Sequence, residues 1–330
     1  MLGRSLAILT FAATLVGVID PAFAGLPGFC GTMDISKMEN AAIENVIMIN
    51  DLTKGRKIRR GQCGLPGEKL NICSACSETT SEPAMRILRP MVGERSHLAW
   101  HADWHELRGT IEPLSPFVFN EAKKAQLVPS NWTFDDFKSK YAIEGGTLAG
   151  ENFFFMHRLM IKMVQLELAG NGQPCFAPWR DIPSSVDDPQ WPTPKRFATP
   201  FAKAAAQAQL EGMQAQLLKL RAPKLLKNVS LNRLGQLIEP RLHMQLHGFF
   251  RSGPACSPEA RAQGFCDDLV PVQSSPLNKH FWKIHGLVDQ LIGDWLRAHD
   301  YREISVKCDG RPGCYQWQGT WIGRYPRGGS

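Results

Sequence analysis

The chain has 330 residues, of which 43% are hydrophobic, so it is long enough to bury a core in one elaborated domain or in two. Its 38 basic residues exceed its 31 acidic residues by seven, and the densest basic run is KGRKIRRG at residues 54–61. No nucleic-acid-binding motif accompanies this run. We therefore interpret it as a solvated loop and expect no nucleic-acid partner.

The N-terminus has the pattern of a secretory signal. Arg4 is followed by a short apolar run at residues 6–18 and by the sequence Ala-Phe-Ala at residues 22–24, which is typical of a cleavage site. The run is too short to span a bilayer, and no later segment is apolar for long enough to do so. We predict a signal peptide over residues 1–24 and a secreted or periplasmic protein with no membrane segment.

The cysteines indicate disulfides, because an exported protein resides in an oxidising compartment. We expect Cys256–Cys266 and Cys308–Cys314 to close short loops, and spacing alone leaves the other pairings open. The nine cysteines are an odd number, so at least one is not paired within the chain. They are Cys30, Cys63, Cys73, Cys76, Cys175, Cys256, Cys266, Cys308 and Cys314.

Helical patterns dominate after an N-terminal region that is rich in cysteine and turn residues. That region covers residues 25–95 and contains one expected helix near 36–50. From about residue 96 to 300 the pattern is helical with long connections, and residues 201–221 are rich in strong helix formers. The tail at residues 301–330 has too much glycine and proline for a long helix. We predict a mainly α fold, a helical bundle with long loops and disulfides.

The histidines repeat one arrangement, in which a pair spaced four residues apart precedes a lone histidine on a later helix. Two histidines at this spacing point the same way on a helix and can share one metal ion. Ligation by imidazole alone suits copper, zinc, iron or nickel. The sequence therefore predicts two sites of three imidazoles each. The first set is His101 and His105 followed by His157, with His97 as an alternative to His105, and the second is His243 and His247 followed by His285.

The surroundings of His285 support a ligand role. This histidine lies on one helical face with four apolar residues, where an imidazole is costly unless its ring nitrogens find partners. A bound metal ion would be such a partner. The apolar members of that face are Phe281, Val288, Ile292 and Trp295.

These motifs resemble those of the type 3 copper proteins, the family of tyrosinases, catechol oxidases and hemocyanins. NKHFWKIHGLVDQLIGDW, from residue 278, is similar to the third-ligand helix of the family's second copper site, with the aromatic pair, the histidine and the later aspartate in place. LHMQLHGFF resembles the preceding helix of that site, and GENFFFMHRLMIKMVQLE resembles the third-ligand helix of the first site. WHADWHEL is similar to the first-site histidine pair of arthropod hemocyanins and phenoloxidases, and FAPWRDIP resembles a Pro-aromatic-x-Asp motif of tyrosinases. The resemblance covers residues 96–298.

The resemblance implies a binuclear centre of two copper ions. The third ligands are His157 for the first copper and His285 for the second, and His97 could replace His105 as the partner of His101. Asp289 would accept a hydrogen bond from a ligand imidazole and orient it. The pairs that complete the two sites are His101 with His105 and His243 with His247.

Three positions depart from the family pattern. Leu148 occupies the place of a loop histidine that tyrosinases have nine residues before the third ligand of the first site, so the helical pair must serve there instead. Several family members have asparagine where this chain has Met244, and Glu239 is off register for its acidic partner. These departures count against hydroxylation of monophenols.

The implied activity is that of an exported copper-dependent phenol oxidase, which oxidises phenols or o-diphenols to quinones with dioxygen. The alternative is a non-enzymatic, hemocyanin-like protein that binds dioxygen or copper, in which a side chain or the aromatic C-terminal tail covers the centre. A degenerate first site would leave a mononuclear copper protein at His243, His247 and His285. The sequence leaves the phenolic substrate and the oligomeric state open.

Overall fold

The structure is a computed structural model, and it is mainly α-helical, as predicted. The predicted signal peptide at 1–24, the helix near 36–50, the basic run at 54–61 and the Cys256–Cys266 pairing lie outside the described residues. The described residues are 32–34, 69–71, 97–110, 113–125, 127–170, 178–188, 197, 199–251, 269, 270, 272, 275–305, 308–318 and 322.

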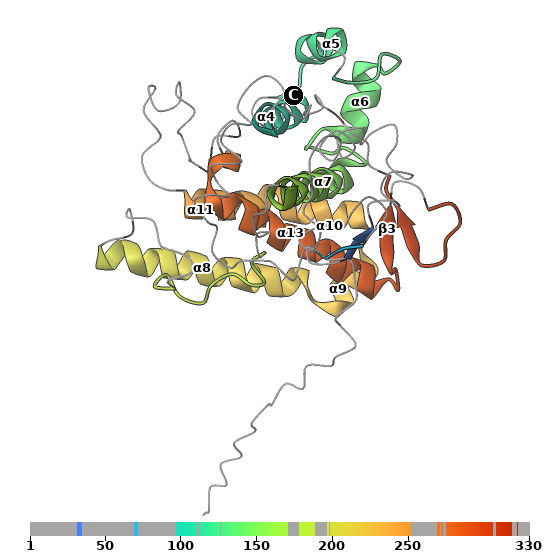
Figure 1. Cartoon of the computed structure of the whole chain (residues 1–330). Helices are drawn as coiled ribbons and strands as arrows, with labels where there is room; N and C mark the ends of the chain where they lie inside the picture. Colours follow the sequence, from blue (N-terminus) through green and yellow to red (C-terminus); the bar gives the residue numbers. More distant parts are fainter. Residues whose placement is uncertain are drawn as a thin grey trace, which may run out of the picture.

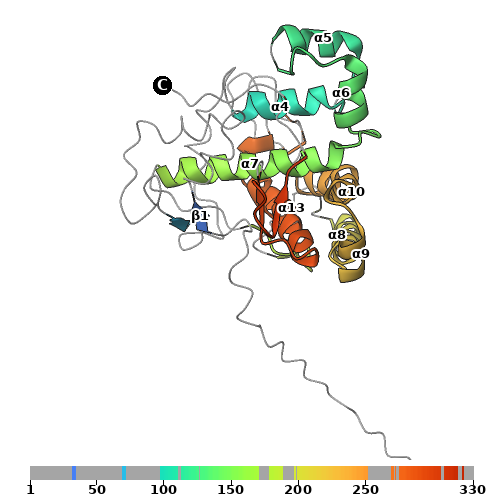
Figure 2. The ribbon, with the colours of Figure 1, turned by 90° about the vertical axis from the view of Figure 1, so that its right-hand side faces the viewer.

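Two long helices run through the middle of the molecule, α7 (Ala149–Gly170) and α13 (Lys279–Ala298), and the short helix α10 (Leu231–Leu237) lies against α7 (Figures 1 and 2). The helices α7 and α10 approach so closely that only glycine fits where they meet. A Cβ atom added to Gly235 would lie 2.0 Å from the carbonyl oxygen of Gly150. This close contact fixes the position of α7 in the core.

A π-helical turn, η4 (Ile238–His243), follows α10 directly and leads into α11 (Met244–Phe250). Pro240 lies inside this turn, and proline has no backbone N–H to donate to the preceding turn of a helix. An α-helix would lose a hydrogen bond at this point, and the wider turn accommodates that loss. The second histidine pair therefore lies at the junction of η4 and α11.

The helix of the first histidine pair is α4 (His97–Leu107), and it is followed by α5 (Pro116–Lys124) and α6 (Phe134–Tyr141). The side chains of Ser115 and Thr133 accept backbone N–H groups at the N-termini of α5 and α6, which sets where each helix begins. In Figure 2, α4, α5 and α6 lie on one side of α7, opposite α8 and α9.

The helix expected at residues 201–221 is confirmed as α8 (Pro200–Leu220), and the short helix α9 (Pro223–Asn228) follows it. Thr199 accepts the N–H of Ala202 and caps α8 at its start. A 3-10 turn, η5 (Ser275–Leu277), precedes α13.

The strands of the described residues form two small sheets. The strands β1 (Thr32–Asp34) and β2 (Lys69–Asn71) pair antiparallel, and β3 (Glu303–Ser305) and β4 (Cys314–Gln316) pair parallel. The predicted disulfide Cys308–Cys314 is confirmed and ties β4 to the loop before it.

The described part of the C-terminal tail packs on α7. The Tyr315 hydroxyl and the Gln318 backbone N–H both donate to the carboxylate of Glu151, and Trp317 contacts the ring of Phe155. Glu151 and Phe155 are four residues apart and share one helical face, whereas His157 lies on another face, some 200° around from Phe155. This part of the tail therefore packs away from the histidine.

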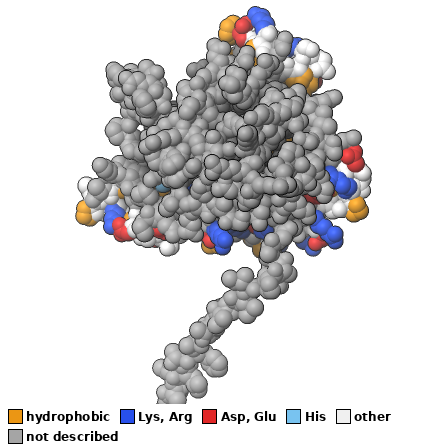
Figure 3. All heavy atoms as spheres, in the orientation of Figure 1, with side chains coloured by type: hydrophobic (Ala, Val, Ile, Leu, Met, Phe, Trp, Pro, Cys, Tyr) orange, Lys and Arg blue, Asp and Glu red, His pale blue; other side chains and the backbone are white. Residues whose placement is uncertain are grey.

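The surface described in Figure 3 mixes charges of both signs, at the α5 end of the molecule and at the ends of α8. Among the described residues, no helix combines the length and the apolar character that crossing a membrane requires. The core beneath this surface is aromatic and aliphatic, and it surrounds a group of buried polar side chains that includes all six predicted ligand histidines.

Candidate metal centre

The six predicted ligands all lie buried in the helical core, and four separate helical segments contribute them. Helix α4 contributes two, α7 and α13 contribute one each, and the η4–α11 junction contributes two. None of the six side chains is more than 7% exposed. They are His101, His105, His157, His243, His247 and His285.

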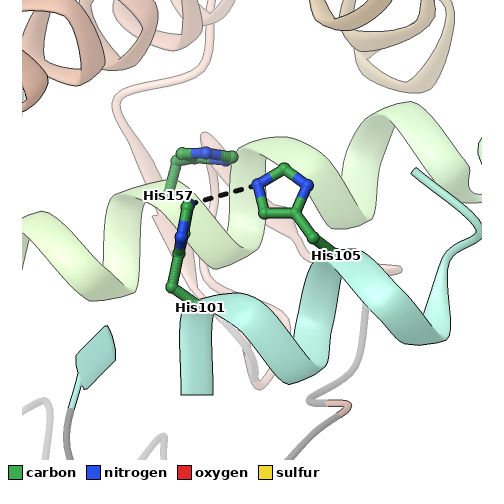
Figure 4. A group of neighbouring side chains, drawn as sticks. All are labelled: His101, His105 and His157. Atoms are coloured by element: carbon green, nitrogen blue, oxygen red, sulfur yellow. Dashed lines mark hydrogen bonds between the residues drawn. The ribbon is translucent and has the colours of Figure 1, made fainter. Parts of the chain in front are cut away.

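The first set brings His101 and His105 from α4 toward His157 from α7 (Figure 4). The Nε2 atoms of His101 and His105 are 3.1 Å apart, and their ring centroids are 4.5 Å apart. His157 is more distant, with its centroid 6.5 Å from that of His101. One nitrogen from each ring lies within 4.8 Å of the others, a spacing that one metal ion could occupy.

The second set is joined through His285. Its Nε2 atom lies 2.9 Å from that of His243 and 3.4 Å from that of His247. His157 of the first set stacks on His285 with ring centroids 4.6 Å apart, and it belongs to a second possible metal group with His243 and His285. The two sets therefore form one continuous cluster, in which His157 lies between them.

Main-chain carbonyl groups orient four of the six rings through their Nδ1 atoms. Helix α7 supplies the carbonyl of Phe153 to His157, and α13 supplies that of Phe281 to His285, each at four residues' distance. A carbonyl oxygen only accepts, so Nδ1 carries the proton in these rings and Nε2 keeps a lone pair. The four Nδ1 to carbonyl distances are 2.8 Å for His101, 2.7 Å for His157, 2.7 Å for His247 and 2.6 Å for His285.

Two residues close together in the sequence, Leu269 and Val272, each orient a ring of a different set. The carbonyl of Leu269 accepts from His247, and the carbonyl of Val272 accepts from His101. The path of this segment therefore affects both halves of the cluster at once.

The fixed protons leave lone pairs that face each other. His247 and His285 both carry their proton on Nδ1, so neither neutral ring can donate across the 3.4 Å between their Nε2 atoms. The Nε2 atom of His157 is buried without a hydrogen-bond partner. An unsatisfied buried nitrogen is costly, and a cation at this point would satisfy the Nε2 atom of His157 and bind the facing lone pairs of His247 and His285. The residues therefore fit a metal ion bound through Nε2.

Burial keeps these rings neutral. Desolvation lowers the pKa of His101 to about 3 and that of His247 to about 4. Desolvation is also the largest cause that lowers the pKa of the other four, and the neighbouring histidines of the cluster lower it further. Metal ligation requires the neutral ring, so the cluster is in the ligating form at neutral pH.

Two rings lack a firm acceptor on their outer nitrogen. The Nδ1 atoms of His105 and His243 are buried with no hydrogen-bond partner of normal geometry, although the Glu239 carbonyl makes a small contribution that raises the pKa of His243. Without a fixed Nδ1 proton, each can donate through Nε2 to its neighbour, His101 or His285. On metal binding that proton must move to Nδ1.

The structure gives Asp289 a different partner from the predicted one. Its carboxylate accepts from Arg158 at 2.6 Å, and both side chains are buried. The Nδ1 atom of His285, one turn earlier, donates to the Phe281 carbonyl instead. The prediction that Asp289 orients a ligand imidazole is therefore wrong, because the adjacent guanidinium is the stronger partner for a buried carboxylate. The ion pair joins α7 to α13.

The alternative ligand His97 is the first residue of α4, and its side chain lies outside the described part of the chain. His105, which we preferred in the sequence, lies in the cluster.

A second buried ion pair, Arg108 with Glu239, escaped sequence reasoning. Arg108 directly follows α4, three residues after His105, and Glu239 lies four residues before His243 in η4. The spacing shows only that each charge shares a helical face with a ligand. That an arginine should meet a glutamate 131 residues away is not visible in the sequence.

Two phenylalanines shield the cluster from the core side. Phe281 contacts the rings of His101, His247 and His285, at centroid distances of 5.2, 5.8 and 3.9 Å. Phe153 contacts His157 at 4.4 Å and His243 at 5.1 Å. Each phenylalanine touches rings of both sets and is fully buried. The pair lowers the polarity around the imidazoles and keeps water from their outer edges.

Comparison with models of known protein families and with curated proteins finds no match to this chain. The assignment of the centre therefore depends on its geometry and on the motifs in the sequence.

Proposed function

We propose that this protein holds two copper ions and oxidises o-diphenols with dioxygen, in the manner of the type 3 copper proteins that its motifs resemble. The central support is the meeting of six neutral imidazoles from four helical segments, with Nε2 lone pairs directed at one another. His101, His105 and His157 would hold the first copper, and His243, His247 and His285 the second. All-nitrogen ligation of this kind is suited to copper.

When bound, a copper pair supplies two-electron chemistry, by which two o-diphenols and one dioxygen give two o-quinones and two waters. The residues of the chain provide the setting. The carbonyls behind Nδ1 hold the imidazoles in one tautomer, which pre-organises the ligand atoms. The two phenylalanines exclude water from the rings.

Diphenols are favoured over monophenols because the buried carboxylate of Glu239, four residues before His243, is already engaged. Glu239 is held by Arg108 through both carboxylate oxygens, so it is not placed to take a proton from a phenol. Met244 supplies no polar group beside His243. A diphenol needs no hydroxylation step before it is oxidised.

The second candidate, a covered dioxygen carrier, needs a segment over the centre. Among the described tail residues, Tyr315 and Trp317 pack on Glu151 and Phe155, away from the histidine face of α7. This contact favours the enzyme over a carrier covered by that part of the tail.

The decisive experiment loads the purified chain with copper and measures copper per chain, the absorption spectrum after addition of hydrogen peroxide, and turnover of catechol. We expect two coppers per chain, a near-ultraviolet band and quinone formation, all lost or reduced in His285→Ala. One copper per chain at saturation would instead indicate a mononuclear protein. Copper binding with the band but no turnover would favour the carrier.

A further inference from the structure

Two buried charges far apart in the sequence meet beside the histidine cluster. The Arg108 guanidinium donates to both oxygens of Glu239, with its Nη2 atom 2.9 Å from Oε2, and the two side chains are 0% and 3% exposed. Arg108 is the residue directly after α4, the helix of His101 and His105, and Glu239 extends from the turn that ends at His243. The ion pair therefore links a helix of the first set to the segment that begins the second.

The guanidinium is fixed on every side. Its Nε atom donates to the carbonyl of Tyr141 at 3.1 Å, and Nη2 also donates to the carbonyl of Ala149 at 2.8 Å. Its carbon lies 4.4 Å from the centroid of the Trp104 ring. The ends of α6 and α7 thus hold Arg108, and Arg108 holds Glu239. A planar guanidinium with this many partners can occupy only one position.

The turn η4 makes this contact sensitive to the position of His243. Glu239 and His243 are four residues apart and lie on nearly the same side of the turn. His105, on α4, and Arg108, whose backbone N–H donates to the Trp104 carbonyl just after the helix, are likewise three residues apart on one side of it. His105 and Arg108 on one segment thus face His243 and Glu239 on the other. A shift of η4 along α4 would break the ion pair and move His243 relative to His105.

We propose that Arg108 and Glu239 are positioning residues, which set the distance between the two halves of the metal centre. This inference rests on the proposed function, because it concerns the coupling of two coppers. The ion pair touches no reacting atom, and it acts by holding η4 against α4. Loss of the pair should leave three imidazoles for each metal but let the halves drift apart.

The test uses the spin of the copper-loaded protein. Two cupric ions coupled through a bridging ligand give no electron paramagnetic resonance signal, whereas ions that drift apart give one each. We compare wild type, Glu239→Gln and Arg108→Lys, measuring copper per chain, helix content by circular dichroism and the resonance signal per copper. Asp294→Asn is the matched control. Asp294 lies on α13 and its carboxylate pairs with Arg221 at the end of α8, away from the cluster.

We expect Glu239→Gln to keep two coppers and its helices but to show a several-fold larger signal per copper than wild type and the control. Arg108→Lys keeps the positive charge but cannot donate to both carboxylate oxygens in the same planar geometry. It should show a smaller rise in the resonance signal per copper. If Glu239→Gln binds two coppers and is as silent as wild type, the inference is wrong and the proposed function stands. If wild type binds fewer than two coppers, the proposed function itself fails.

Should Glu239→Gln fail to fold, Arg108→Met combined with Glu239→Leu replaces the test, because removing a whole buried ion pair is often tolerated when removing one partner is not. If the double variant binds two coppers and gives no resonance signal, like wild type, the inference is wrong. A resonance signal per copper larger than that of wild type supports it.

Discussion

The two halves of the histidine cluster are built differently. In the second set, His285 lies within 3.4 Å of both His243 and His247, measured between Nε2 atoms, so the three rings form a compact group. In the first set, only His101 and His105 are that close, and the third ring, His157, stacks on His285 of the other set instead. The contrast indicates that His285 joins the rings of the second set, whereas His157 is shared by the two groups whose nitrogens lie close enough to hold a metal ion, one with His101 and His105 and one with His243 and His285.

The largest expected effect comes from removing the ring that joins both sets. His285→Ala should reduce bound copper below one per chain, because this ring contacts His243, His247 and His157. His105→Ala, which removes an outer ring of the first set, should leave about one copper per chain bound by the second set. Metal analysis after dialysis against excess copper measures both.

Equal losses in the two variants would contradict the contrast between the halves. His299→Ala is a suitable control, because this histidine lies just after α13, donates through Nε2 to the Leu226 carbonyl and packs on Trp295 and Tyr301, and the variant should keep full copper binding.

Acid should destabilise the metal-free protein strongly. The folded-state pKa values of the six rings lie below the ordinary value, so the unfolded chain binds more protons once the pH falls below about 6.5. The free energy of unfolding is then greatest above that pH and falls as pH decreases toward about 4 for His247 and about 3 for His101. Each ring contributes up to about 1.4 kcal/mol per pH unit.

Acid titration followed by circular dichroism, with and without copper, measures this effect. Copper binds the folded state through the same nitrogens, so it should move the midpoint of acid unfolding to lower pH. A metal-free protein that is equally stable at pH 7 and pH 5 would show that the rings are not buried in the neutral form.

The ion pair between α7 and α13 offers a smaller effect that acts on the compact side of the cluster. Asp289→Ala leaves the buried Arg158 without its carboxylate, which should lower the free energy of unfolding by about 3–5 kcal/mol. Asp294→Ala removes a partly exposed carboxylate from the same helix and should cost about 1 kcal/mol or less. Denaturant unfolding of the two variants at pH 7 compares them. Similar costs would mean that Asp289 does not join the helices.

The close approach of α7 and α10 gives the smallest expected effect. Gly235→Ala places a Cβ atom against the backbone of Gly150 and should cost about 1–3 kcal/mol, because α7 must move outward. Gly212→Ala on α8 is the matched control, since open space surrounds that position, and it should stabilise by up to about 1 kcal/mol. If the first variant also shifts the copper spectrum, the position of α7 affects both sets.

Sequence reasoning found the six histidines that cluster in the structure, because two histidines four residues apart on a helix point the same way. It also predicted α8 from its helix formers and the Cys308–Cys314 loop from its short spacing. It failed for Asp289, because a motif cannot show that Arg158, 131 residues away, competes for the carboxylate. It could not foresee the π turn at Pro240, since the register of a helix depends on what it packs against.

The carbonyls of Leu269 and Val272 have a consequence for how the protein can vary. A main-chain oxygen cannot be replaced by a substitution and does not titrate. Point substitutions at Leu269 and Val272 can therefore leave the orientation of the His247 and His101 rings intact. Insertion or deletion of one residue between Leu269 and Val272 would instead move their carbonyls and so change the orientation of both rings. We therefore expect this segment to tolerate substitutions but not insertions or deletions, although none of its side chains is a predicted metal ligand.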